Sequence, residues 1–255
     1  MRATKQEGSN MKPGRLKQIL LLTDGCSNHG EDPIAVAALA RNQGITVNVI
    51  GVLDDRQNGQ PQGLEEVESI AEAGGGVSQI VYQQSLSQTV QMVTRQAMTQ
   101  TIQGVVNKEL QEILGKSQTI EELPPEQRGE VVEVVDELGE SCDLEVLVLV
   151  DTSASMHHKL PTVKDALYDL SLSLNARTGS NQFSVYTFPD PKRTIKRMVD
   201  WTPELGEING IFSKLNSGGY TPTGPALKEA IYAFAEKPLF RTMRDEVDPY
   251  EETGN

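Results

Sequence analysis

The chain of 255 residues has little cysteine, few aromatic residues and a deficit of positive charge. Its two cysteines, Cys26 and Cys142, are too few for a disulfide framework and are typical of a reducing compartment. Lysine and arginine number 23 against 36 acidic residues, and the net charge of −13 argues against nucleic acid or an anionic membrane as partner. No apolar run reaches membrane-spanning length, and the N-terminus lacks a signal-peptide core. We therefore expect a cytoplasmic protein.

Apolar runs of strand length alternate with helical patterns along most of the chain. We expect strands at 17–23, 45–52, 77–82, 144–150, 182–187 and 194–201. We expect helices at 33–42, 64–73, 86–114, 126–138, 160–176, 204–215 and 225–236, with Val105 on the apolar face of the 86–114 helix. This alternation predicts a doubly wound α/β sheet of about six mainly parallel strands. The short link before 194–201 predicts one antiparallel edge strand.

The buried-strand pattern 144–150 ends abruptly in the polar sequence DTSAS. Asp151, Ser153 and Ser155 occupy alternate positions there, so in an extended chain their side chains point to the same side. Ligands gather at the carboxyl ends of such strands in open α/β sheets. One carboxylate and two hydroxyls are hard oxygen ligands, which suit Mg²⁺, Mn²⁺ or Ca²⁺ rather than zinc. The alternative is an ordinary turn in which Ser155 caps the next helix.

Two further stretches carry the same chemistry. Asp24 follows the apolar run 17–23 in ILLLTDG, and Thr221 stands in GGYTPTGPAL before an expected helix. We expect His29, His157 and His158 to rim the site rather than to bind metal, and Cys26 to be a packed thiol rather than a nucleophile. The chain has no G-x-x-x-x-G-K-[ST] sequence, so nucleotide binding is not expected.

These three motifs together resemble the metal-ion-dependent adhesion site (MIDAS) of the von Willebrand factor A (vWA, integrin I-like) domain family. The chain is similar to vWA-domain proteins of spore-forming bacilli. The resemblance implies that Asp151, Ser153, Ser155, Thr221 and Asp24 hold Mg²⁺ or Mn²⁺. It also implies that a partner protein supplies a glutamate or aspartate carboxylate to the remaining coordination position.

The motifs stand in an unusual order, because the family places its strand-end aspartate last and here Asp24 comes first. The simplest account is a circular permutation. Residues 17–105 then form the second half of the fold, 106–143 a helical connector and 144–236 the first half. We expect 1–16 to be a flexible N-terminus and 237–255 a mobile acidic tail. We favour a monomer closed on itself over a domain-swapped dimer.

Three functions fit these observations. We favour a divalent-metal-dependent protein–protein interaction module that is not an enzyme. One alternative is a Mg²⁺-dependent hydrolase or phosphatase, since two aspartates and one ion can activate water. Against it, the only basic groups next to the motifs are His157, His158 and Lys159. The other alternative, implied by the resemblance, is a scaffold for an AAA+ ATPase.

Overall fold

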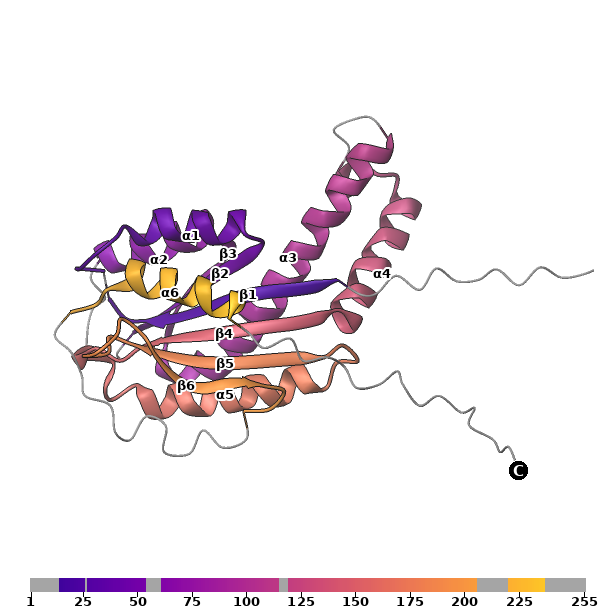
Figure 1. The fold of residues 1–255 in the computed structure, drawn as a ribbon. Coiled ribbons are helices and arrows are strands. Elements are labelled where there is room, and N and C mark those ends of the chain that lie inside the picture. Colours follow the sequence, from indigo (N-terminus) through magenta and orange to yellow (C-terminus); the bar gives the residue numbers. More distant parts are fainter. Residues whose placement is uncertain (1–13, 26, 54–60, 115–118, 206–219, 237–255) are drawn as a thin grey trace, which may run out of the picture.

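A six-stranded sheet forms the centre of the protein in the computed structural model, which describes residues 14–25, 27–53, 61–114, 119–205 and 220–236 (Figure 1). The strands, in the spatial order β3-β2-β1-β4-β5-β6, are β1 (Arg15–Thr23), β2 (Ile45–Leu53), β3 (Gly75–Tyr82), β4 (Asp143–Asp151), β5 (Asn181–Phe188) and β6 (Lys196–Thr202). The pairs from β3 to β5 are parallel, and β6 pairs antiparallel with β5. The expected α/β architecture with one antiparallel edge strand is confirmed.

Helices cover both faces of the sheet (Figure 1). They are α1 (Pro33–Asn42), α2 (Pro61–Ala73), α3 (Leu86–Leu114), α4 (Pro125–Ser141), α5 (Leu160–Asn175) and α6 (Thr223–Ala235). Buried residues of α1, α2 and α6 belong to one apolar core, and those of α3, α4 and α5 belong to the other. The helix expected at 204–215 and the expectations for the two termini fall mostly or wholly outside the described residues.

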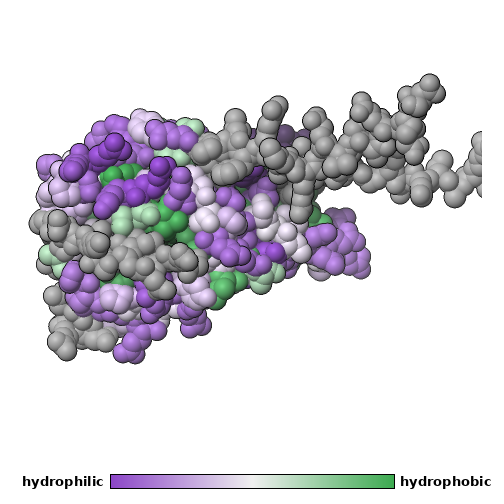
Figure 2. Space-filling model, turned by 60° about the horizontal axis from the view of Figure 1, so that its bottom comes forward, coloured by the Kyte–Doolittle hydropathy of each residue, from purple (hydrophilic) through white to green (hydrophobic). Residues whose placement is uncertain are grey.

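The central strands β1 and β4 are buried on both sides, which explains their continuous apolar sequences. Successive residues alternate between the two cores: Leu20 and Leu22 of β1 pack on the α3–α5 side, whereas Ile19 and Leu21 pack on the α1–α2 side. The face of the molecule shown in Figure 2 is largely hydrophilic, with only small hydrophobic areas. None of the described helices is both long and apolar enough to cross a bilayer.

Pairing of β1 with β4 joins the two halves of the chain within one molecule. The register runs in parallel from Arg15 opposite Asp143 to Leu22 opposite Val150. The two halves of this chain therefore form one sheet, and the monomeric state stays a prediction. The circular permutation itself stays a prediction, because strand pairing does not show which order of the halves is ancestral.

The connector between the halves is a helical hairpin made by the end of α3 and by α4. This hairpin extends beyond the edge of the sheet (Figure 1), so Val105 is 57% exposed rather than part of an apolar face as expected. Arg177 fastens the base of α4 to the sheet. Its guanidinium donates hydrogen bonds to the carbonyl oxygens of Gly139 (2.8 Å) and Cys142 (2.8 Å) and to Oδ1 of Asn181 (2.7 Å).

Candidate metal centre

The carboxyl ends of β1 and β4 lie side by side, and each carries an aspartate. Asp151 is the last residue of β4, and Asp24 directly follows β1. The parallel register places Thr23 next to Asp151, although the two residues are 128 positions apart in the sequence. Because polar groups at the ends of adjacent parallel strands share one edge of the sheet, the two distant motifs meet there.

Asp151 is fully buried and accepts two hydrogen bonds. The hydroxyl of Thr23 donates to Oδ2 over 2.9 Å, and the backbone N–H of Ser153 donates to Oδ1 over 2.8 Å. Burial raises the pKa of Asp151 to about 6, although these two hydrogen bonds act in the opposite direction. Within the described part of the chain, no cation forms an ion pair with Asp151. The centre therefore contains a buried carboxylate whose charge is not compensated.

Asp24 lies in a different environment, because each of its oxygens has a hydrogen-bond donor. The hydroxyl of Ser155 donates to Oδ1 over 2.8 Å, and the ammonium group of Lys159 contacts Oδ2 over 2.5 Å. Lys159 also donates to the carbonyl oxygen of Val52 over 2.8 Å and is almost fully buried. Asp24 is thus compensated by a buried lysine of the same chain.

The hydroxyls of Ser153 and Ser155 connect the two aspartates, with 3.2 Å between their oxygens. Both serines lie where the chain turns out of β4, and Ser155 belongs to the short 3₁₀ helix η3 (Ala154–Met156). The alternative in which Ser155 caps the next helix is wrong: α5 begins at Leu160, and its first turn has no side-chain cap. The side chain of Ser155 is directed to Asp24 instead.

Thr221 is held at the loop that follows Asp24. Its N–H donates to Oδ1 of Asn28 over 2.8 Å, and its carbonyl oxygen accepts the N–H of Asn28 over 3.2 Å. Hydrogen bonds therefore link Thr221 to this loop, and no described hydrogen bond links it directly to Asp24, Asp151 or the serines. Four of the five expected site residues form one hydrogen-bonded cluster, and the fifth is bonded to Asn28 in the loop that follows Asp24.

Close backbone packing holds the start of α6 against the same loop. A Cβ atom at Gly224 would lie 1.9 Å from the carbonyl oxygen of Glu31, so only glycine fits there. Gly30 has a φ of 89°, and a Cβ atom at this position would lie 2.3 Å from Pro225. These contacts leave the Thr221 segment little freedom to move away from the Asp24 loop.

Two functional candidates were not expected from the sequence. The first is Lys159, whose role in holding Asp24 is described above. The sequence spacing could have predicted that Lys159 is buried. Lys159 lies four residues before Val163 and eight before Leu167, in helical phase with the buried face of α5. The second is Thr223, whose buried hydroxyl has no hydrogen-bond partner among the described residues. The resemblance of GGYTPTGPAL to the family motif selects Thr221, and nothing in the sequence indicates that the hydroxyl of Thr223 is buried without a partner.

The remaining candidates lie at the rim or outside the site. His157 and His158 are exposed, and the ring of His29 packs edge-on against Tyr220, with 5.4 Å between ring centres. Cys26 lies outside the described residues. Cys142 is buried, which raises the pKa of its thiol and keeps it unreactive at neutral pH.

The donor atoms of the cluster fit a hard divalent cation. They are carboxylate and hydroxyl oxygens, without histidine or cysteine. Among the described residues, no three His, Cys, Asp or Glu side chains are grouped so that they could hold a metal ion by themselves, so the hydroxyls of the cluster would have to contribute. The uncompensated charge of Asp151 is the second feature that a cation would satisfy.

Comparison with known proteins defines the class. Two models of the von Willebrand factor type A domain match this chain, one over residues 1–96 and the other over residues 146–247. Together they match most of the chain in two separate stretches, on either side of the α3–α4 connector. The chain belongs to the vWA domain family.

Two relatives extend over nearly the whole chain. The uncharacterized protein YabS of Bacillus subtilis (strain 168) is 59% identical over 224 residues, which cover 88% of this chain and 91% of YabS. An uncharacterized protein from Alicyclobacillus acidocaldarius subsp. acidocaldarius DSM 446 has a crystal structure that is similar to this one, with a TM-score of 0.80 and 42% identity. That match covers 88% of this chain and 96% of the crystallised one. The arrangement of the two halves is thus shared by a solved structure.

Proposed function

We propose that this protein is a divalent-metal-dependent interaction module that binds an acidic residue of a partner protein. Asp151, Ser153, Ser155, Thr221 and Asp24 would hold the ion, with Mg²⁺ or Mn²⁺ as the cation. The observation that supports this proposal is the hydrogen-bonded cluster that joins Asp151, Ser153, Ser155 and Asp24 across the β1–β4 junction.

The charges of the cluster support an anionic ligand. Asp24 and Asp151 carry two negative charges when ionised, and Lys159 returns one positive charge to Asp24. A bound divalent cation therefore leaves the site with about one unit of positive charge, which favours a single carboxylate. When bound, the ion would supply the positive charge that the partner's carboxylate meets. The protein residues hold the ion, orient its oxygen donors and exclude water from Asp151.

Mg²⁺-dependent thermal stability tests the proposal. Saturating Mg²⁺, at about a hundred times its dissociation constant, should stabilise the native protein by about 2.7 kcal/mol. Asp151→Ala should remove this increment while the protein stays folded by circular dichroism. Asp165→Ala, at an exposed carboxylate on α5, is the matched control and should keep it. An unchanged Mg²⁺ titration in Asp151→Ala would remove Asp151 from the site.

We further propose a binding role rather than a catalytic one. The ammonium group of Lys159 is already bonded to Asp24 and Val52, so it is not placed to act as a general acid or base. Incubation with generic phosphoesters and Mg²⁺ tests this. Hydrolysis that depends on both Mg²⁺ and Asp151 would contradict the binding role.

A further inference from the structure

A groove begins at the rim of the candidate metal centre and runs between the β5–β6 hairpin and α6. Its first part, a cavity of about 540 Å³, begins at His29, Tyr220 and Pro222, next to Thr221. Its second part, of about 890 Å³, continues between the β5–β6 hairpin and α6 to Tyr186 and Tyr232. Residues 190–193 and Glu229 line both parts, so the two cavities are one continuous depression.

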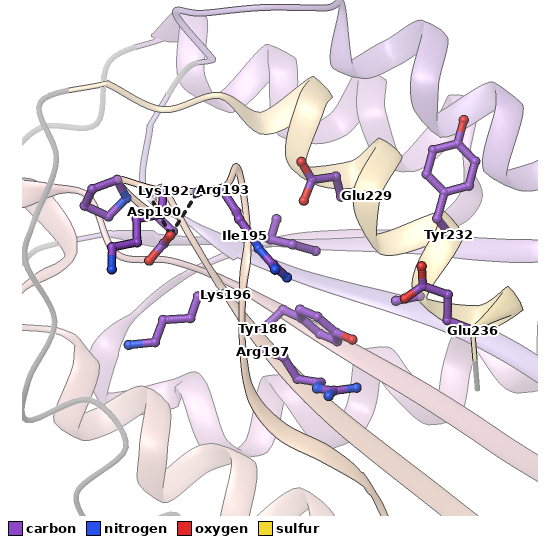
Figure 3. Close-up of a pocket in the computed structure, with 12 residues that line it drawn as sticks. Tyr186, Asp190, Lys192, Arg193, Ile195, Lys196, Arg197, Glu229, Tyr232 and Glu236 are labelled. Carbon is purple, nitrogen blue, oxygen red and sulfur yellow. Dashed lines mark hydrogen bonds between the residues drawn. The ribbon is translucent and has the colours of Figure 1, made fainter. Parts of the chain in front are cut away.

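One wall of this groove is the β5–β6 hairpin, which is basic in a strongly acidic protein. The segment 190–197 (DPKRTIKR) carries four basic residues and one acidic residue, although the chain has a net charge of −13. The carboxylate of Asp190 accepts the backbone N–H groups of Lys192 and Arg193, both over 3.0 Å, and so fixes the turn from which these side chains project (Figure 3). Within the described residues, the side chains of Lys192, Arg193 and Lys196 have no ion-pair partner.

The other wall is one face of α6. Pro225, Glu229, Tyr232 and Ala233 of α6 and Glu236 at its C-cap line the groove at helical spacing. Figure 3 shows Glu229, Tyr232 and Glu236 across from the hairpin residues. The helical rise from Pro225 to Glu236 is about 16 Å, which matches about five residues of an extended peptide. Glu229 and Glu236 make this wall acidic, so the two walls differ in charge.

We propose that this groove binds an extended acidic segment of the same partner whose carboxylate reaches the metal centre. The inference rests on the proposed function, because the groove begins at the rim of that site. Alternate side chains of an extended segment point in opposite directions, so acidic residues at every second position would face Lys192 and Arg193. The residues between them, neutral or basic, would face Glu229. The hairpin thus selects acidic partners, and the metal centre anchors one carboxylate.

Peptide probes of different length test the inference on the full chain. N-acetylglutamate methylamide offers one side-chain carboxylate, and acetylated hexaglutamate amide also fills the groove. In saturating Mg²⁺, nuclear magnetic resonance titrations should show hexaglutamate binding about tenfold more tightly than the single residue, since two exposed ion pairs of ordinary strength give this factor. Lys192→Glu/Arg193→Glu should abolish the length advantage without affecting the single-residue probe.

Two further double variants serve as controls for the charge of the groove. Lys108→Glu/Lys164→Glu changes the net charge equally at sites outside the groove and should keep the length advantage. Glu229→Gln/Glu236→Gln removes the acidic wall and should strengthen hexaglutamate binding by about twofold to threefold.

The outcomes separate the groove from the metal centre. A hexaglutamate that binds no more tightly than the single residue, or whose advantage survives the hairpin reversal, overturns the groove proposal and leaves the metal-centre proposal intact. A length advantage that the reversal removes but that does not need Mg²⁺ supports the groove and overturns the metal centre's role.

Discussion

Asp24 and Asp151 both lie at the carboxyl ends of adjacent parallel strands, but their environments differ. Asp24 receives a hydroxyl on one oxygen and the ammonium group of Lys159 on the other. Asp151 receives a hydroxyl and a backbone N–H, and burial raises its pKa to about 6. One carboxylate is therefore already neutralised by the chain, whereas the other carries a buried charge for which a divalent cation is the natural counterpart.

This difference assigns separate tasks to the two aspartates. Asp151 would contribute most of the attraction for the ion, because its charge is otherwise uncompensated. Asp24 would mainly orient Ser155, since its own charge is shared with Lys159.

Replacing Lys159 should have the largest effect on stability. Lys159→Met leaves Asp24 buried without a cation, so the metal-free protein should lose about 3–5 kcal/mol of unfolding free energy. Mg²⁺ should recover part of this loss, because the ion then supplies a positive charge near Asp24 in place of Lys159. Urea unfolding with EDTA and with Mg²⁺ measures both quantities.

The control is Lys164→Met within α5, where the lysine pairs with the exposed Asp165. It should change stability by less than about 1 kcal/mol. Equal losses in the two variants, or a Lys159→Met protein that Mg²⁺ stabilises less than the wild type, would show that Lys159 does not compensate Asp24.

Asp151→Asn should stabilise the metal-free protein at neutral pH. The folded pKa of Asp151, about 6, exceeds its ordinary value of 3.8, so the folded state holds this proton to higher pH than the unfolded state does. Stability from this group is present below about pH 4 and is lost as pH rises through about 6. Asp151→Asn lacks the titrating group, so its free energy of unfolding should not fall in this pH range. The difference from the wild type should reach about 3 kcal/mol, which corresponds to a shift of about two pKa units.

Urea unfolding in EDTA between pH 4 and 7 measures the difference between wild type and variant. That difference should grow with pH through this window and level off above it. Asp165→Asn, at an exposed position, provides the baseline for the other carboxylates. A difference that does not vary with pH would mean that Asp151 is not the buried charge described here.

Ser155→Ala breaks the hydrogen-bonded link between the two aspartates. It removes the donor to Asp24 Oδ1 and the contact with Ser153, so Mg²⁺ affinity should fall by about 1 kcal/mol, or about fivefold. Isothermal titration calorimetry measures it. Ser69→Ala, which removes an exposed hydroxyl on α2, should leave Mg²⁺ affinity unchanged. Equal affinities in wild type and Ser155→Ala would place Ser155 outside the ion's surroundings.

The smallest effects distinguish the two threonines before α6. Thr221→Val should weaken Mg²⁺ binding a few-fold with little effect on stability. Thr223→Val replaces a buried hydroxyl that has no partner among the described residues, so it should stabilise the metal-free protein by about 1 kcal/mol and leave Mg²⁺ affinity unchanged. The reverse pattern would assign the site's oxygen to Thr223.

Much of the fold could be predicted from the sequence because the signals are local. The apolar runs of β1 and β4, the helix from Leu86 to Leu114 and the short link before β6 predicted the elements and the antiparallel edge. Exposure was harder to predict: Val105 has the spacing of a buried residue, but the sheet does not extend far enough to cover it. Helical periodicity indicates a face, whereas neighbouring elements decide whether that face is covered.

For the candidate site, the oxygen donors and their place after two buried strands were predictable from the sequence. Residue type and strand-end position are local properties, and a known motif makes them recognisable. Folding brings Lys159 to Asp24 rather than to Asp151, although Lys159 and Asp24 are 135 residues apart along the chain. The fold also places a basic hairpin opposite α6 beside the site. Charge compensation depends on distance in space, and that distance is fixed only when β1 and β4 pair.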